Sequence, residues 1–578
     1  MFEPSNRTAF LRHLRPPSGF RLERALGTTY TLDLDALAAA LGSMAGVNDT
    51  VVGGTDVFLS ALMNVRSRLR LYCHPGKIAS PRGQAGSLKL LDEVIRSPIL
   101  KRGRFHPKLW LLRFNSERRG EVPKYRLIVS SRNLTASTIF FESALVLEGS
   151  PQPHTGLNKN LLRFLRTLSP SERHRWSDLD RVEFRPPPRI NSIGLHFQWG
   201  ANRNKLSSAI LTRHYTRAVI VSPFVDAGFL RTFKCDDLTL ISNRTALDAL
   251  GGTQPNIKRF VIGDVPGEDG SRFFEGLHAK ILATESPLGP EICLGSANAT
   301  TAAWGGANTE AAAILSGPGA SLKSFQNDFI FVKGTTLHPW IQSYEPPDDA
   351  RVSAEARAKI QFERDSDEIV QALLAKSWEL TSTDKTAAVL RPAAAKKPKN
   401  SVDVTKLSCG LLGGPHRPIG DWPTRRLIEL ALPNGAEGLT DLIELRFTCI
   451  SRITSRRVRF KIVFKAQATF DRAARDRSVL RGLTSDNARF YSLMTGLFEP
   501  HHSAASGKHR DRRKKRSSST EVDGLLESIL QGLSAAPERW GDLKRIAESR
   551  ENPDPDFQEL WRTLLSIFER TPSRRVAG

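Results

Sequence analysis

The chain has 578 residues, a net charge of +24 and five scattered cysteines, and 40% of its residues are hydrophobic. This length predicts roughly three or four domains, and no run reaches the roughly 18 apolar residues of a membrane-spanning helix. Without a C-x-x-C pair or an apolar leader segment, we expect a cytoplasmic protein that lacks disulfides and structural zinc. The strongly basic balance favours a polyanionic partner, either nucleic acid or an acidic membrane surface.

The first predicted strands, VVGG at Val51–Gly54 and LRLYC at Leu69–Cys73, lead to a strand that carries two polar groups. FHPKLWLL is apolar apart from His106 and Lys108. Residues two apart in a strand point to the same face, so these two side chains are expected to lie side by side.

A turn-rich stretch and a second strand, YRLIVSS, follow this triplet. The strand ends in the run SSRN, which contains Ser131 and Asn133, and NLTAST then predicts a helix start. Further along, Glu142 lies in the apolar stretch FESALVL. This first set therefore combines a histidine, a lysine, an amide and a carboxylate.

The same order of elements returns in the second part of the chain. VIVSP at Val219–Pro223 and LTLIS at Leu238–Ser242 precede the only other H-x-K triplet, which holds His278 and Lys280. The strand EICLGS then leads into a second small-residue run. That run and the stretch behind it contain Ser296, Asn298 and Glu310.

Two such sets in one chain predict an α/β fold, because strands alternate with helices and imply mostly parallel sheets covered by helices. We expect two pseudo-symmetric α-β-α halves that share one active site, with RPPPR at Pro186–Pro188 in the connection between them. The apolar flanks place the polar groups in a cleft, where unpaired cations are costly. A bound anion would offset that cost.

Together the two sets can bind and cleave a phosphodiester without a metal or other cofactor. Two lysines, two amides and one protonated histidine can hold the phosphate oxygens, while the other, neutral histidine attacks phosphorus. Glu142 and Glu310 are candidates for fixing the histidine tautomers, and the alternative for both is a salt bridge or a helix cap. Ser131 and Ser296 either bond to the phosphate or shape the turn.

These motifs resemble the phospholipase D superfamily, whose H-x-K-x4-D and G-S-x-N motifs occur here as H-P-K…S-S-R-N and H-A-K…G-S-A-N over about residues 25–345. Arg113 and Glu285 stand where that motif has aspartate, and an H-K-N pattern is similar to the nuclease and tyrosyl-DNA phosphodiesterase branches. The resemblance implies that His106 is the nucleophile, that His278 is the acid, and that a phosphohistidine forms. It also implies a bacterial restriction or anti-phage role beside a helicase or methylase of the same operon.

The remaining third resembles no family that we recognise. Its pattern is helical over 351–380, AAVLRPAAAKKPKNS reads as a linker, and strand-like alternation over 404–470 includes the basic segment RRVRFKIVFK. The latter is either a nucleic-acid surface or a solvated strand face. The expected divisions are 1–170 and 171–345 for the halves, 346–402 for helix and linker, 403–500 for a small β-rich domain, 501–521 for a basic disordered linker and 522–578 for a helical segment.

The basic run is a second candidate binding segment, because it can neutralise phosphates regardless of sequence. Its candidate residues are Lys508, Arg510, Arg512, Arg513, Lys514, Lys515 and Arg516. We therefore expect a metal-independent phosphodiesterase that acts on nucleic acid, on DNA rather than RNA, and not on a membrane. The alternatives are a phospholipid phosphodiesterase or transferase and a non-catalytic nucleic-acid-binding module.

Overall fold

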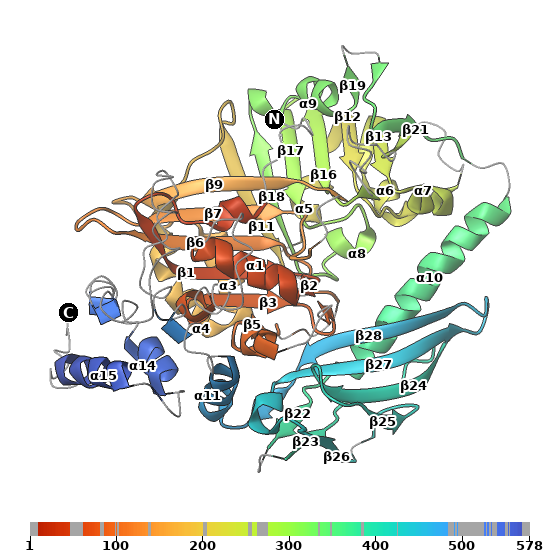
Figure 1. Ribbon diagram of the computed structural model, residues 1–578. Helices are drawn as coiled ribbons and strands as arrows, with labels where there is room; N and C mark the ends of the chain where they lie inside the picture. Colours follow the sequence, from red (N-terminus) through yellow and green to blue (C-terminus); the bar gives the residue numbers. More distant parts are fainter. Residues whose placement is uncertain are drawn as a thin grey trace.

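The computed structural model shows an α/β protein in which two halves share one site and a smaller β-rich and helical region follows (Figure 1), as the sequence predicts. The structure describes residues 10–46, 62–80, 86–98, 100, 103–136, 140–199, 205–251, 257–262, 276–332, 336–346, 350–382, 386–424, 426–483, 490–491, 494, 525–526, 529–530, 533, 540–548, 553 and 555–568. Within these residues no helix is long and apolar enough to cross a membrane.

The sheet of the first half has seven strands in the order β10-β9-β7-β6-β1-β3-β5. Its strands are β1 (Phe20–Thr29), β3 (Leu69–Cys73), β5 (Ile95–Arg96), β6 (Leu109–Ser116), β7 (Lys124–Ser130), β9 (Ala144–Pro151) and β10 (Val182–Phe184). Its helices are α1 (Leu34–Met44), α3 (Lys159–Leu168) and α4 (Pro170–Arg175), with 3-10 turns η1 (Phe10–Leu14), η2 (Gly86–Glu93) and η3 (Ser177–Arg181).

The sheet of the second half has eight strands in the order β11-β18-β17-β16-β12-β13-β14-β21. Its strands are β11 (Ser192–Gln198), β12 (His214–Val221), β13 (Lys234–Ser242), β14 (Ile257–Ile262), β16 (Ile281–Ser286), β17 (Gly289–Gly295), β18 (Glu310–Ser316) and β21 (Ile341–Ser343). Its helices are α5 (Ser207–Ile210), α6 (Ala227–Thr232), α7 (Arg244–Leu250), α8 (Thr301–Trp304) and α9 (Leu322–Phe329), with the turn η4 (Pro318–Ala320) and the hairpin of β19 (Phe331–Val332) and β20 (Thr336–Leu337).

Six strands of each sheet follow the same order, so the repeat read from the sequence is a repeat of topology. β9-β7-β6-β1-β3-β5 corresponds to β18-β17-β16-β12-β13-β14. The expectation of mostly parallel sheets is wrong: β1, β3 and β5 are parallel, but β6, β7 and β9 are antiparallel. The H-x-K hairpin causes this difference, because a tight turn can join only antiparallel strands.

One part of the sequence alignment of the halves is corrected. The strand that corresponds to β12 is β1, Phe20–Thr29, and not Val51–Gly54, which lies outside the described residues. Leu69–Cys73 and Leu238–Ser242 do correspond, as the neighbouring parallel strands β3 and β13. A helix follows the second motif as expected (α8), whereas residues 134–136 after the first are not helical and 137–139 lie outside the description.

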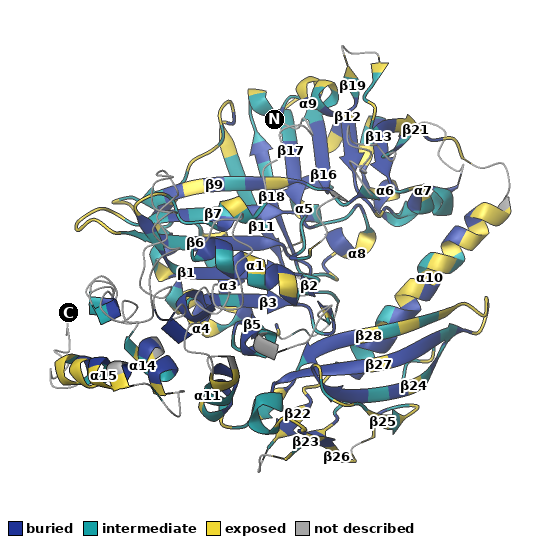
Figure 2. Ribbon diagram, in the orientation of Figure 1, coloured by how far each residue is buried: buried dark blue, intermediate teal, exposed yellow. Residues whose placement is uncertain are grey.

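The two sheets face one another across a shared apolar core. Alternate residues of each strand point to opposite faces, and on β6 Leu109 and Leu111 join the shared core while Trp110 and Leu112 join the core beneath α1. Helices α3 and α9 contribute to the shared core, and α6, α7 and α8 cover the outer face of the second sheet. Figure 2 shows these strands as largely buried, which explains their continuous apolar runs.

The chain crosses from the first sheet to the second between β10 and β11, with Pro186–Pro188 in the connection as expected. The first sheet continues past the expected division at 170/171. Both α4 and β10 still belong to the first half, because β10 pairs with β9. Proline fixes its own φ and lacks an amide donor, so this run ends one sheet before the next begins.

A long helix, α10 (Ala350–Leu373), leads from the second half to two smaller sheets (Figure 1). These contain β22 (Glu379–Thr381), β23 (Ala387–Arg391), β24 (Val402–Leu411), β25 (Arg417–Gly420), β26 (Ile428–Ala431), β27 (Leu442–Ser451), β28 (Arg457–Lys465) and β29 (Gln467–Thr469), with the turn η5 (Gly435–Gly438). The expected linker is thus partly wrong, since its AAVLR segment forms β23 and pairs with β22 and β26.

The β-rich region is not separate from the first half. Two short strands of that half, β2 (Leu32–Asp33) and β4 (Ile78–Ala79), extend the sheet of β24, β27 and β28. A buried ion cluster joins the same parts, because Arg475 of α11 (Arg472–Leu483) contacts Asp92 at 2.9 Å. The helices α11, α14 (Trp540–Glu548) and α15 (Pro555–Phe568) pack on the core beneath α1.

Candidate active site

Two short backbone pairings between the halves place the histidines. The residue before His106 bridges to Thr309, the residue before Glu310, and the amide of His106 donates to the Thr309 carbonyl at 3.0 Å. Gly103 makes this crossing possible: its φ is +73°, and a Cβ there would lie 1.7 Å from the carbonyl oxygen of Ala307.

The second crossing is the reciprocal of the first. β15 (Gly276–Leu277), just before His278, pairs in parallel with β8 (Phe140–Phe141), just before Glu142. The amide of His278 donates to the carbonyl of Phe141 at 2.9 Å. Each half therefore delivers its glutamate to the histidine of the other half.

The first of these pairs is fully enclosed. His106 Nδ1 lies 2.9 Å from Glu310 Oε2, and the two side chains are 10% and 0% exposed. Glu310 is held in place by Ser296 Oγ, which donates to Oε2 at 2.5 Å, and by Asn308 Nδ2, which donates to Oε1 at 3.2 Å. In its ionised form the carboxylate fixes Nδ1 as the protonated nitrogen and leaves a lone pair on Nε2.

The second pair has the same atoms but a more open setting. His278 Nδ1 lies 3.0 Å from Glu142 Oε1, and the side chains are 23% and 15% exposed. The second oxygen of Glu142 lies 3.6 Å from Arg132 Nη1. Nδ1 of this histidine therefore faces a carboxylate, as in the first pair.

The lysines are fixed to the histidines through the backbone. Lys108 Nζ donates to the carbonyl oxygen of His106 at 2.9 Å, and Lys280 Nζ donates to that of His278 at 2.6 Å. Both lysines are nearly inaccessible, at 1% and 3% exposure. An ammonium group has three donors, so each lysine keeps two for an anion.

Burial and mutual repulsion of the cations shape the protonation of the site. Burial lowers the pKa of His106, and Lys108 and Lys280 lower it further. The pKa of His278 is lowered by burial and then by the same two lysines. Burial also lowers the pKa of Lys280 to about 7.

The carboxylates shift in the opposite direction. Burial raises the pKa of Glu142 and that of Glu310 to about 7, because the charged form loses its hydration. Near neutral pH each glutamate can therefore carry a proton that its histidine partner can receive. An anion bound between the two lysines would draw that proton onto the imidazole, since it offsets their repulsion.

The asparagines and serines have different tasks in the structure. Oδ1 of Asn133 accepts backbone N–H groups of Tyr30 and Thr31 at 3.3 and 3.4 Å, which leaves its NH2 group as a donor. Ser131 Oγ accepts the amide of Ser143 at 2.9 Å, the residue after Glu142. Ser296 Oγ likewise accepts the amide of Ala311 at 2.9 Å, so each hydroxyl holds the residue that follows a site glutamate.

Two hydroxyl residues at this edge escaped the sequence reasoning. Thr29 Oγ1 accepts the amide of Leu134 at 3.0 Å, and Ser222 Oγ accepts that of Ala299 at 2.9 Å. Each hydroxyl oxygen thus holds the residue that directly follows Asn133 or Asn298. Thr29 ends β1 and Ser222 directly follows the corresponding strand β12, and the carboxyl ends of such strands are where α/β sheets form their sites, so this rule was the available signal.

Arg113 and Glu285, which stand where the family motif has aspartate, each form an ion pair with a neighbouring strand of their own sheet. Arg113 Nε contacts Glu23 at 2.8 Å, and Glu285 accepts from Arg217 Nε at 3.0 Å. The first half places the cation on the hairpin and the anion on β1, and the second half reverses the signs. Both positions lie on the strands and not among the groups that surround the histidines.

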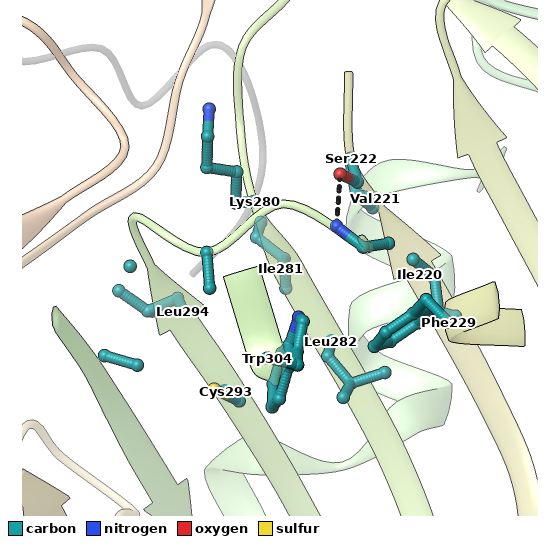
Figure 3. A pocket seen from close by; sticks show the side chains of 14 residues that line it. Ile220, Val221, Ser222, Phe229, Lys280, Ile281, Leu282, Cys293, Leu294 and Trp304 are labelled. Carbon is teal, nitrogen blue, oxygen red and sulfur yellow. Dashed lines mark hydrogen bonds between the residues drawn. The ribbon is translucent and has the colours of Figure 1, made fainter. Parts of the chain in front are cut away.

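Figure 3 shows a cavity in the second half. A cavity of about 20 Å³ lies among β12, β16, β17 and α8, and the side chain of Lys280 extends away from its apolar lining, which includes Leu282 and Trp304. That volume holds about one water molecule. Among the described residues no group of three or more His, Cys, Asp or Glu side chains could hold a metal ion.

No family model and no curated protein matches the sequence. Among solved structures, polyphosphate kinase from Porphyromonas gingivalis is similar at 14% identity with a TM-score of 0.34, over 62% of this chain and 51% of that chain. Yeast tyrosyl-DNA phosphodiesterase is similar at 11% identity with a TM-score of 0.37, over 59% and 95%. A phospholipase D family member from Salmonella typhimurium is similar at 11% identity with a TM-score of 0.18, over 27% and 98%.

The chain thus spans only about half the length of that kinase. At these identities and TM-scores, we rest the functional argument on the site. The resemblance to the phospholipase D superfamily holds in the arrangement of that site: both H-x-K…N sets, from two α/β halves of equal strand order, lie at one interface.

Proposed function

We propose that the protein is a phosphodiesterase that cleaves nucleic acid through a phosphohistidine intermediate. The observation that carries this proposal is the pair of exchanged His–Glu contacts, His106 with Glu310 and His278 with Glu142. Two histidines whose Nδ1 atoms each face a glutamate, beside two buried lysines, can supply an attacking group and a proton donor around one anion. A purely binding module would need only the cations.

In the first step, Nε2 of His106 attacks phosphorus and forms the N–P bond while the P–O bond to the leaving group breaks. His278 gives the proton on its Nε2 to the leaving oxygen, so charge does not build up there. The lysines and the amide of Asn133 hold the non-bridging oxygens as negative charge develops on them.

In the second step, His278 is neutral and takes a proton from a water molecule. The water oxygen attacks phosphorus, the N–P bond breaks, and His106 returns to its starting form as the phosphate product leaves. The glutamates keep both Nδ1 atoms as donors through both steps. The chemistry proposed uses only side chains of the chain itself.

Nucleic acid is the substrate that the net charge of +24 favours, and DNA is preferred to RNA in this proposal. The candidate basic run from Lys508 to Arg516 lies outside the described residues, so its contribution remains a prediction. A cytoplasmic restriction or anti-phage nuclease beside a helicase or methylase is the corresponding biological proposal.

The experiment that tests the activity is a cleavage assay in excess EDTA, with single-stranded DNA, duplex DNA, RNA and bis(p-nitrophenyl) phosphate as substrates. Cleavage of one of them that survives the chelator and is lost in His106→Ala supports the proposal. Activity that vanishes with EDTA and returns with magnesium would overturn the two-histidine mechanism. If the protein hydrolyses phospholipid in liposomes and none of these four substrates, it is a phospholipid phosphodiesterase instead.

A further inference from the structure

A cluster of three charged side chains lies beside the first histidine and takes no part in the mechanism above. Lys77 Nζ contacts Asp367 Oδ1 at 2.9 Å, and Arg104 Nη2 contacts the other oxygen of the same carboxylate. The three side chains are all partly exposed, and they sum to one excess positive charge. We call Lys77 and Arg104 the basic pair.

The basic pair is connected to the active site through Tyr30. The Tyr30 ring packs against the His106 ring at 5.0 Å between centroids, and Lys108 Nζ lies 5.7 Å from the Tyr30 centroid. Lys77 Nζ lies 5.4 Å from the same centroid. One aromatic ring thus separates a catalytic lysine from a cation of the basic pair.

The chain positions the backbone of both cations independently of Asp367. Arg104 is held because its amide donates to Asn308 Oδ1 at 3.2 Å, and Asn308 also bonds Glu310. Lys77 follows Gly76, whose φ is +74°. This loop follows β3, so the basic pair lies at the carboxyl edge of the parallel strands, where phosphate ligands bind in α/β sheets.

Asp367, by contrast, comes from outside both halves. It lies on α10, the helix that leads to the β-rich region, and α10 packs directly against the Lys77 loop. Its carboxylate spans two cations with two oxygens, which is the contact that a phosphate group makes with Lys and Arg. The carboxylate therefore occupies a place suited to a phosphate.

We propose that the basic pair is a second phosphate subsite, which binds a phosphate flanking the scissile one, and that Asp367 fills it in the free protein. This inference rests on the proposed function and specifies the substrate as a strand with several phosphates rather than a single phosphodiester. The flanking phosphate replaces the carboxylate of Asp367, so substrate binding releases both ion pairs between the first half and α10.

The test is binding of a fluorescein-labelled single-stranded DNA oligonucleotide to the full chain, followed by anisotropy at several salt concentrations. All variants are made in the His278→Ala background, which prevents turnover and leaves the first half unaltered. Asp367→Asn should tighten binding several-fold and leave the slope of log K against log salt nearly unchanged, because the flanking phosphate contacts the basic pair in both proteins. Lys77→Gln should weaken binding several-fold and flatten the slope by about 0.7, the value for one phosphate on a single strand.

The matched control is Arg213→Gln, which also removes one cation paired with a carboxylate, Glu291 at 2.7 Å, at the opposite end of β12 from the site. This control should bind like the parent. Weakened or unchanged binding in Asp367→Asn would overturn the subsite and leave the cluster as an ion-pair clamp. If Asp367→Asn does not fold, Lys77→Gln provides the test. A binding constant and a salt slope equal to those of Arg213→Gln would overturn the proposed subsite. Hydrolysis of bis(p-nitrophenyl) phosphate by the unaltered chain tests the proposed function separately.

Discussion

The two His–Glu pairs use the same atoms in different surroundings. The His106–Glu310 pair is enclosed, and two side chains, Ser296 and Asn308, bond its carboxylate. In the His278–Glu142 pair both side chains are more exposed, and the carboxylate faces the cation of Arg132. The chain thus builds one rigid histidine and one that is nearer to solvent.

This difference matches the two tasks of the mechanism. A nucleophile benefits from a fixed direction of attack, because orientation lowers the barrier of the bond-forming step. The proton donor must later meet a water molecule, so it needs access to solvent. The geometry therefore favours His106 as the nucleophile and His278 as the acid and base, the same order that the family resemblance implies.

The largest expected effect is the loss of either histidine. His106→Ala and His278→Ala should each lower kcat by several orders of magnitude, because groups that act as a unit are not additive. The exposed His214, which pairs with Asp236, supplies the control His214→Ala with activity near the parent. Steady-state rates in EDTA measure this, and full activity in either site variant would remove the two-histidine mechanism.

A smaller effect should separate the two carboxylates. Glu310→Gln and Glu142→Gln should each reduce kcat about 10–100-fold, as loss of a partner that orients a histidine does. The reduction should be greater for Glu310, which is fully buried and bonded twice. Glu291→Gln, on the outer end of β17, is the matched control. Rates equal to the control would show that the carboxylates are only structural.

The smallest predicted effect concerns pH. Because burial raises the pKa of Glu142 to about 7, the His278–Glu142 pair, which must donate a proton, loses that proton as the pH rises through 7. Lys280, with a pKa lowered to about 7, loses its charge over the same range. We expect kcat/KM to decline by at least about tenfold per pH unit above 7. A profile that rises from pH 7 to 9 would contradict these assignments.

The repeat and the chemistry of the site could be predicted from sequence because local patterns carry them. Each H-x-K triplet directly precedes an apolar strand, β6 or β16, and so marks equivalent positions in the two halves, although the triplets themselves lie before the strands and not within them. The exchange of glutamates between the halves was not visible, since it depends on the pairing of β8 with β15 and of Phe105 with Thr309. Such short pairings join distant segments and have no local signal.

Two further errors share this cause. Phe20–Thr29 was not recognised as the first strand of its half, because its sequence mixes basic and apolar residues, and its burial depends on α1 and the C-terminal helices. The linker prediction at 387–391 failed because β23 is stabilised by pairing with β22 and β26 rather than by its own composition. In both cases distant partners decided the structure.

The central claim is that His106 becomes covalently phosphorylated and that His278 completes the cycle. The direct measurement is denaturing mass spectrometry of His106→Ala and His278→Ala after incubation with bis(p-nitrophenyl) phosphate, whose leaving group needs no protonation. We predict a phosphoryl adduct on His106 in His278→Ala, which lacks the group that activates water, and none in His106→Ala. An adduct on His278 in His106→Ala would reverse the roles, and an adduct in neither variant would contradict the covalent mechanism.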